Sequence, residues 1–254
     1  MVDYELNGHV ALLTINRPEA RNAVNGDVST GMEAAIDALE DDDDAWVGVL
    51  TGAGPVFSAG ADLKVIASGD IGQLATKRGG FAGIVQRERT KPIIAAVDGP
   101  ALAGGTEIVL SCDLVVASNE ARFGIPEVKR SLVAAAGGLF RLPRKLPFSI
   151  ALELAMTGDP ISAERAHHFG MVNELCAPGQ AVEAAMALAE RIAVNAPLAV
   201  RESRRLVLES IEVGDDDEGI RRSNEAMMGL AATEDFAEGP MAFIEKRDPV
   251  WKGR

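Results

Sequence analysis

Three times in its first 125 residues the chain repeats one arrangement: a strand-like apolar run, a loop of small residues, and the start of a helix. The apolar runs are residues 9–15, 46–50 and 93–97, and the helices that follow them begin near Val28, Asp62 and Ala103. Strands that alternate with helices in this way build layered α/β structures. The sequence therefore predicts an α/β core.

Two local patterns near the start of the chain refine this prediction. Asn7-Gly8 separates the strand-like residues 4–6 from residues 9–15, which predicts a β-hairpin closed by a two-residue turn. Residues 69–83 show no clear periodicity, and their glycines indicate a mobile loop within a broken helix.

The C-terminal part of the chain has a different character. Beyond Gly137 nearly every segment has helical spacing, and Pro197 stands where a further helix would begin. We therefore predict two parts, a core of residues 1–195 and a helical C-terminal region of residues 196–254. Such a region can pack on its own core or against a neighbouring subunit.

Composition narrows the class of protein. A chain of 254 residues with 47% hydrophobic and 25% charged residues can bury a sizeable core. The net charge of −13 argues against nucleic acid as a partner, because phosphate binding requires a basic surface. We interpret the acidic runs 41–44 and 215–218 as solvated turns where a helix ends or a loop begins.

The sequence shows no sign of export or membrane insertion. No run approaches the roughly 20 apolar residues of a membrane helix, and the N-terminus lacks the basic region of a signal peptide. Cys112 and Cys176 are too few and too far apart for a disulfide framework or a cysteine metal cluster, so we interpret both as buried thiols. We expect a cytoplasmic protein with no membrane partner.

Two strand-to-helix junctions, residues 57–64 and 98–107, carry the clearest chemical signal. In each, small residues lead into a helix start, where backbone N–H groups lack intrahelical partners and the helix dipole favours negative charge. Side by side, the two junctions could direct two N–H groups at one carbonyl oxygen and form an oxyanion hole. Either junction alone is more typical of an ordinary glycine-bearing loop.

Two glutamates lie close to these junctions in the sequence. Glu107 falls in the first turn of the helix that Ala103-Gly104-Gly105 opens, and Glu127 follows the short strand-like run 123–125. A pair of carboxyl groups can accept and donate protons in one reaction. Taken singly, Glu107 could instead be a favourable charge at a helix start, and Glu127 a loop residue.

The order of the motifs resembles that of enoyl-CoA hydratases of the crotonase superfamily, from about Tyr4 to Arg254. The segments that carry the resemblance are Asn16-Arg17-Pro18 with Arg21-Asn22-Ala23, residues 58–64, residues 101–107 with Cys112-Asp113, residues 123–127, Gly137-Gly138, Thr157-Gly158, Gly170-Met171-Val172 and residues 243–247. Each segment is weak evidence alone, but their shared order and spacing are specific. The resemblance implies a ββα spiral core of the crotonase type and a helical C-terminal trimerisation region.

The resemblance also implies a reaction and its residues. The backbone N–H groups of Ala61 and Gly104 would hold the thioester oxygen of an acyl-CoA. Glu107 and Glu127 would position and activate one water, which adds to C3 of a trans-2-enoyl-CoA while C2 receives a proton. The product would be a 3-hydroxyacyl-CoA, formed without a metal or a separate cofactor. The three histidines match no catalytic position of the family and are poorly spaced for a metal site.

Binding of the coenzyme A part is implied for a further group of residues. The positions that match are Arg21, Ala23, Ala59, Asp62, Leu63, Lys64, Phe243 and Lys246. Arg21 and Lys64 would meet phosphates, and the two tail residues lie near coenzyme A across a subunit interface in some relatives. The family commonly forms homotrimers or homohexamers.

The chain departs from the family pattern at one place. Hydratases often read Pro-Gly-x-Gly-Gly after the second glutamate, whereas this chain reads Val133-Ala134-Ala135-Ala136-Gly137-Gly138. Ala135 replaces a glycine whose N–H helps to hold the water, so the Cβ of Ala135 could reshape the acyl site. Three alternatives therefore stay open: an enoyl-CoA isomerase, a carnitinyl-CoA-type dehydratase and a non-catalytic acyl-CoA-binding protein. The presence of both glutamates favours the hydratase.

Overall fold

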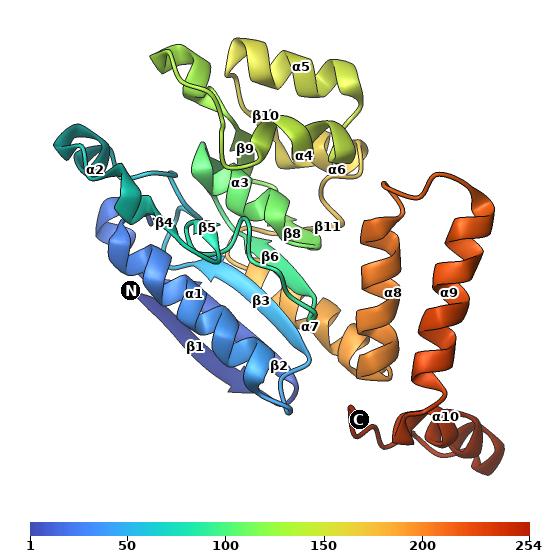
Figure 1. The fold of residues 1–254 in the computed structure, drawn as a ribbon. Helices are drawn as coiled ribbons and strands as arrows, with labels where there is room; N and C mark the ends of the chain where they lie inside the picture. Colours follow the sequence, from blue (N-terminus) through green and yellow to red (C-terminus); the bar gives the residue numbers. More distant parts are fainter.

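The computed structural model describes residues 1–254, with a six-stranded sheet in the order β1-β2-β3-β6-β8-β11 at its centre (Figure 1). The strands span Val2–Asn7 (β1), Val10–Ile15 (β2), Val47–Gly52 (β3), Ile93–Val97 (β6), Leu114–Ser118 (β8) and Glu174–Cys176 (β11). β1 pairs with β2 antiparallel across the Asn-Gly turn, and all the other neighbours are parallel. The predicted α/β core and its hairpin are confirmed.

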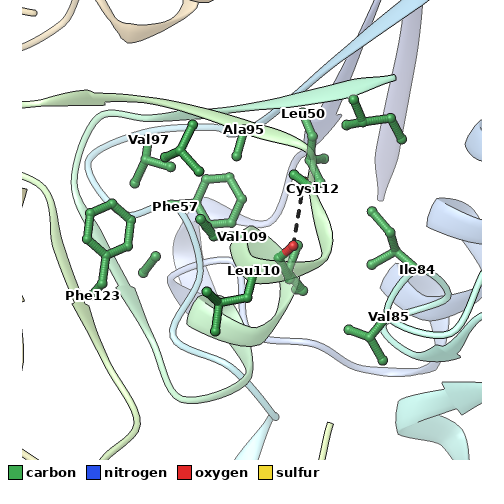
Figure 2. Close-up of a cluster of buried hydrophobic side chains, with 14 of the residues drawn as sticks. Leu50, Phe57, Ile84, Val85, Ala95, Val97, Val109, Leu110, Cys112 and Phe123 are labelled. Atoms are coloured by element: carbon green, nitrogen blue, oxygen red, sulfur yellow. Dashed lines mark hydrogen bonds between the residues drawn. The ribbon is translucent and has the colours of Figure 1, made fainter. Parts of the chain in front are cut away.

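Helices cover both faces of this sheet. Ile93 and Ala95 of β6 point into a main cluster of 39 buried residues, whereas Ile94 joins a second cluster beneath α7 (Ala181–Ala193). A strand buried on both faces has no polar side, which explains why residues 93–97 are entirely apolar. Figure 2 shows part of the main cluster, where Val109 and Leu110 of α3 (Gly104–Ser111) lie close to the strands.

A small second sheet connects the two junctions singled out in the sequence. Its strands are β7 (Pro100–Leu102), β9 (Arg122–Gly124) and β10 (Ile161–Ser162), in the order β10-β9-β7. β7 runs parallel to β9, and Ala101 also forms a parallel bridge with Ser58. This sheet brings the start of α3 and the segment after β9 to one place.

The helix α1 (Gly26–Asp41) is capped at both ends by side chains. The Asn25 carboxamide oxygen accepts a hydrogen bond from Val28 N–H at the N-terminus. At the C-terminus the buried Lys91 Nζ donates to the carbonyl oxygens of Leu39 and Asp42, each at 2.6 Å. The acidic run 41–44 does end a helix, but the run 215–218 begins one, because the Asp215 carboxylate caps α9 (Asp216–Leu230).

Residues 69–83 do not form the predicted loop within a broken helix. They contain a 3₁₀ helix, η2 (Ile71–Leu74), and a short hairpin of β4 (Ala75–Thr76) and β5 (Gly80–Phe81). The Glu33 carboxylate of α1 accepts hydrogen bonds from the Thr76 hydroxyl at 2.5 Å and from Gly79 N–H at 2.9 Å. A side chain distant in sequence therefore holds this segment, which local periodicity could not reveal.

The C-terminal half is mostly helical, as predicted, although β10 and β11 interrupt it. Its remaining helices are η3 (Pro126–Arg130), α4 (Gly138–Lys145), α5 (Phe148–Thr157), α6 (Ala163–His168), α8 (Pro197–Glu209), α9 (Asp216–Leu230) and α10 (Glu234–Glu245). In Figure 1, α8, α9 and α10 stand to one side of the sheet. No helix combines the length and apolar character needed to cross a membrane.

A network of ion pairs connects α8 to the core. Asp113, directly before β8, accepts hydrogen bonds from Arg204 of α8 at 2.9 Å and from Arg89 at 3.0 Å. Arg204 also donates to the carbonyl oxygen of Arg89. Of the two cysteines, Cys112 beside this network is buried and Cys176 is half-buried, so the prediction of two buried thiols is only partly right.

Candidate active site

The two small-residue junctions lie side by side, as the oxyanion-hole hypothesis requires. Leu102 N–H donates to the carbonyl oxygen of Ser58 at 3.0 Å. Gly60 lies so close to the start of α3 that a Cβ on it would come within 2.7 Å of Gly104 N. Gly60 also has φ of +84°, a conformation that glycine adopts without strain. The close approach and the positive φ both require glycine at position 60. The absence of a Cβ lets the main chains of the two junctions come into contact.

Two backbone N–H groups at this contact have no acceptor within the chain. Gly60 O accepts from Val24 N–H, and Asp62 N–H donates to Val24 O, which leaves the N–H of Ala61 between them unpaired. The N–H of Gly104, the first residue of α3, is likewise unpaired. Unpaired donors at the N-terminus of a helix are suited to bind a negatively charged oxygen.

Backbone strain is stored next to one of these donors. Ala103, directly before Gly104, has φ of 53° and ψ of −127°, which is unusual for a residue with a Cβ. The conformation is held by the hydrogen bond from Ala103 N–H to Gly124 O at 2.8 Å. Strained main chain that the surroundings enforce is typical of functional sites.

Glu107 is buried one turn inside α3, with 3% of its surface exposed. Its Oε1 accepts a hydrogen bond from Gly138 N–H at 2.9 Å. Burial raises the pKa of Glu107 to about 7, and the nearby charge of Glu127 acts in the same direction. The backbone N–H groups of Gly138 and Ala136 and the charge of Arg141 oppose this rise in pKa.

Glu127 lies in η3, directly after β9. Its Oε2 is buried and has no hydrogen-bond partner in the chain, and burial raises the pKa of this carboxyl as well. The hydroxyl of Thr106, next to Glu107, donates to the carbonyl oxygens of Ala101 and Gly124 and accepts from Gly124 N–H. Thr106 thereby ties the segments that carry the two glutamates together.

The arrangement combines two kinds of chemistry. Two carboxyl groups with raised pKa values can accept and donate protons in a reaction with a substrate. The unpaired N–H groups of Ala61 and Gly104 can stabilise negative charge on an oxygen. Together these groups suit proton transfer beside a carbonyl.

Comparison with known proteins identifies the family. The family model described as enoyl-CoA hydratase/isomerase matches residues 5–254. The chain belongs to the enoyl-CoA hydratase/isomerase family. A carnitinyl-CoA dehydratase from Salmonella heidelberg (strain SL476) is 39% identical, over 98% of this chain and 97% of that protein.

Solved structures of the family share the fold. The crystal structure of enoyl-CoA hydratase from Mycobacterium tuberculosis H37Rv is 47% identical, with a TM-score of 0.94 over 100% of this chain and 99% of that one. A carnitinyl-CoA hydratase from Mycobacterium avium is also 47% identical, with a TM-score of 0.78 over 100% and 98% of the two chains. The predicted crotonase-type fold is thus confirmed.

Six of the eight residues predicted to bind coenzyme A lie together at the first junction of this enoyl-CoA hydratase/isomerase family member. They are Arg21, Ala23, Ala59, Asp62, Leu63 and Lys64, the last two at the start of α2 (Leu63–Ser68). Ala59 N–H donates to Arg21 O at 3.0 Å, which joins the two segments that carry them. Arg21, Ala59, Leu63 and Lys64 are exposed, whereas Ala23 and Asp62 are buried.

Asp62 has a structural role that the sequence did not reveal. Its carboxylate accepts from Lys64 N–H at 2.9 Å, which caps α2, and pairs with Arg17 at 2.7 Å. The Lys64 N–H and the Arg17 guanidinium hold the pKa of Asp62 below its usual range. Arg17 also donates to Ala23 O, so this ion pair braces the main chain beside Ala61.

The other two predicted residues are not brought to this site within one chain. Phe243 lies on α10 and is 85% exposed, and Lys246 is the residue that ends this helix. In Figure 1, α10 lies at the opposite end of the molecule from α2. Within one chain, Phe243 and Lys246 therefore lie far from the other six predicted residues.

Proposed function

We propose that this chain is an enoyl-CoA hydratase, which reversibly adds water to a trans-2-enoyl-CoA and forms a 3-hydroxyacyl-CoA. The observation that carries the proposal is a pair of carboxyl groups with raised pKa values, the buried Glu107 and the half-buried Glu127, together with the unpaired N–H groups of Ala61 and Gly104. The family and the names of its relatives support the same reaction class.

The two glutamates differ in their hydrogen bonds. Glu107 Oε1 accepts from Gly138 N–H, whereas Glu127 Oε2 receives no hydrogen bond. One of the two groups, as the carboxylate, takes a proton from the water as the water oxygen bonds to C3, and the other, as the acid, delivers a proton to C2. Between these events the thioester oxygen carries enolate-like charge, which the N–H groups of Ala61 and Gly104 stabilise.

A second candidate substrate class is favoured by the names of relatives. The Salmonella relative is a carnitinyl-CoA dehydratase and the Mycobacterium avium structure a carnitinyl-CoA hydratase. The same two glutamates would then remove or add water on an acyl group that carries a quaternary ammonium. Crotonyl-CoA, longer and branched enoyl-CoAs, and the dehydrated carnitinyl thioester, assayed side by side, separate the two candidates by their relative kcat/KM values.

The central test replaces each carboxyl by an amide of the same shape. Glu107→Gln and Glu127→Gln should each lower the hydration rate by at least ~10²-fold, because general acid–base groups typically contribute that much. The rate is followed by the loss of ultraviolet absorbance of the conjugated thioester. Affinity for acyl-CoA should change much less, because the N–H groups of Ala61 and Gly104 remain.

The matched control is Glu120→Gln, which changes an exposed glutamate in the turn between β8 and β9. This variant should keep the wild-type rate. An isomerase that uses a single glutamate would lose activity in only one of the two variants. A protein that only binds acyl-CoA would turn over no thioester, and full activity in either Gln variant would disprove the two-glutamate mechanism.

We further propose that the chain assembles as a homotrimer or homohexamer through its C-terminal helices. Large apolar side chains are exposed along α8, α9 and α10, among them Val207, Met228 and Phe243, each at least 70% exposed. Large exposed apolar side chains on three successive helices support an interaction surface in this region. In such an assembly Phe243 and Lys246 would lie near the coenzyme A of a neighbouring subunit.

A further inference from the structure

The side chain of Arg141 connects two loops that are distant from each other in sequence. Arg141 lies in the first turn of α4. Its Nη1 donates to the carbonyl oxygen of Ala136 at 3.2 Å, and its Nη2 donates to the carbonyl oxygen of Val85 at 2.5 Å. The guanidinium thus engages main-chain oxygens on two sides, which its planar set of five donors permits.

The first loop, residues 136–138, holds the carboxyl group of Glu107. Gly138 N–H donates to Glu107 Oε1 at 2.9 Å. Gly137 has φ of +110°, and a Cβ on it would come within 2.1 Å of Arg141 Nη1. A residue other than glycine at position 137 would therefore both strain the main chain and displace the guanidinium. The close packing shows that the loop and Arg141 form one unit.

The second loop, residues 81–85, contacts the oxyanion donor. The N–H groups of Ile84 and Val85 both donate to the carbonyl oxygen of Phe81 at 3.3 Å, so the loop is a single tight turn. A Cβ on Gly104 would come within 2.5 Å of the Phe81 ring, which places that ring against Gly104. The side chains of Ile84 and Val85 anchor the turn in the main hydrophobic core (Figure 2).

We propose that Arg141 is a positioning residue for the reaction: its guanidinium fixes the loop that holds Glu107 relative to the turn that packs on Gly104. The inference rests on the proposed function of these two residues. One side chain then fixes the position of the Glu107 carboxyl group, which transfers the proton, relative to the Gly104 N–H, which binds the thioester oxygen. Arg141 forms no hydrogen bond with either group. Small errors in this spacing are costly, because a displacement of about 1 Å can lower the rate ~10²-fold.

The charge of Arg141 has a second effect at this place. Glu107 is faced by the carboxyl group of Glu127 from η3 and by Arg141 from α4, and only Arg141 favours its ionised form by charge. Arg141 itself is faced by Arg89, Arg144 and Cys112 as well as by Glu107. Loss of the guanidinium charge should therefore raise the pKa of Glu107 further.

The test compares Arg141→Met and Arg141→Lys with Arg144→Met, a change of an exposed arginine on the same helix. We expect Arg141→Met to lower kcat by roughly 10–100-fold, with a smaller change in KM. The limb of the pH–rate profile that reports Glu107 should move to higher pH by roughly half a unit or more. Arg144→Met should leave kcat and the profile unchanged.

Arg141→Lys separates geometry from charge. The ammonium group keeps the positive charge but cannot span both carbonyl oxygens as the guanidinium fork does. The pH profile should therefore return toward that of the wild type while kcat stays low. Wild-type kcat in Arg141→Met, or a pH profile that does not move, would overturn the proposal.

A measurement without substrate keeps this test independent of the proposed reaction. Amide hydrogen exchange in residues 136–138 and 81–85 should accelerate in Arg141→Met and remain at the wild-type rate in Arg144→Met. Unchanged exchange in either loop of Arg141→Met would overturn the bracing role. If the wild type hydrates no enoyl thioester but both loops loosen, the proposed function fails while the bracing role stands.

Discussion

Burial of Glu107 has a thermodynamic cost that depends on pH. In the unfolded chain this carboxyl ionises near its ordinary pKa of 4.5, whereas in the folded protein its pKa is about 7. Below pH 4.5 both states are protonated. As the pH rises from 4.5 to 7 only the unfolded chain loses its proton, so the folded state becomes less stable. Above about pH 7 this loss of stability is complete.

The Glu107→Gln variant should therefore be more stable than the wild type at alkaline pH. The amide cannot ionise and can still accept the hydrogen bond from Gly138. We expect its free energy of unfolding to exceed that of the wild type by roughly 2–3 kcal/mol at pH 8.5 and to match it near pH 4. Urea unfolding at the two pH values measures the difference. A gap that widens at low pH would contradict the raised pKa.

Individual residues of the site were predictable to different degrees. Glu107 stands out in the sequence because it is the one acid in a helix of small and apolar residues, and the order of motifs adds Glu127. Arg141 could not be found in this way, because its partner Val85 lies 56 positions away and offers only a backbone carbonyl. Every residue type has a backbone carbonyl oxygen, so the identity of Val85 does not indicate that it accepts this hydrogen bond.

At the scale of secondary structure, the C-terminal end of α1 is capped by Lys91, a lysine from a loop that is distant in sequence. Lys91 is 1% exposed, and its Nζ donates hydrogen bonds to carbonyl groups at the C-terminal end of α1. Burial lowers the pKa of this lysine. The hydrogen bonds are formed to three carbonyl oxygens, those of Leu39, Glu40 and Asp42.

Lys91→Met should consequently destabilise the fold. The variant keeps most of the apolar stem but leaves one buried and two half-buried carbonyl groups without this donor, so the free energy of unfolding should fall by about 1–3 kcal/mol. Chemical denaturation measures the change. Lys77→Met, at an exposed position of the β4–β5 hairpin, should stay within about 0.5 kcal/mol of the wild type. Equal stability of both variants would argue against the capping role.

Long elements were predictable, whereas most short strands, apart from β9 near residues 123–125, were not. The apolar periodicity of α1, β2, β3 and β6 extends over enough residues to be recognised locally. β11 has three residues and β4 and β5 have two each, which is too short for any period to appear. These strands are defined by their pairing partners and by contacts such as that of Glu33 with Thr76.

For the whole molecule, the order of the strands and the contact between the two junctions depend on pairings remote in sequence. From the sequence, only the family resemblance of the motif order predicted these pairings. The division of the chain at residue 195 and the role of the tail in assembly stay predictions. The exposed side chains on the C-terminal helices allow the second of these to be tested.

A charge placed on these helices should weaken assembly. Met228→Glu on α9 and Phe243→Glu on α10 each introduce a carboxylate at a position at least 70% exposed in one chain, where a subunit interface would bury it unpaired. Sedimentation should show smaller species than the wild type. Asn224→Glu, an exposed polar position on α9, serves as the control. Wild-type sedimentation of both apolar-site variants would exclude these helices from the interface.

The position of α8, α9 and α10 after the completed sheet has a consequence during translation. When residue 196 has been added, the residues of every strand and of α7 have been synthesised, and residues 197–254 remain to be made. At 5–20 residues per second, synthesis of this last part takes about 3–12 s. The nascent core can therefore fold before the exposed apolar side chains of α8, α9 and α10 are made. For the proposed subunit interface, this order of synthesis would delay association between chains on neighbouring ribosomes.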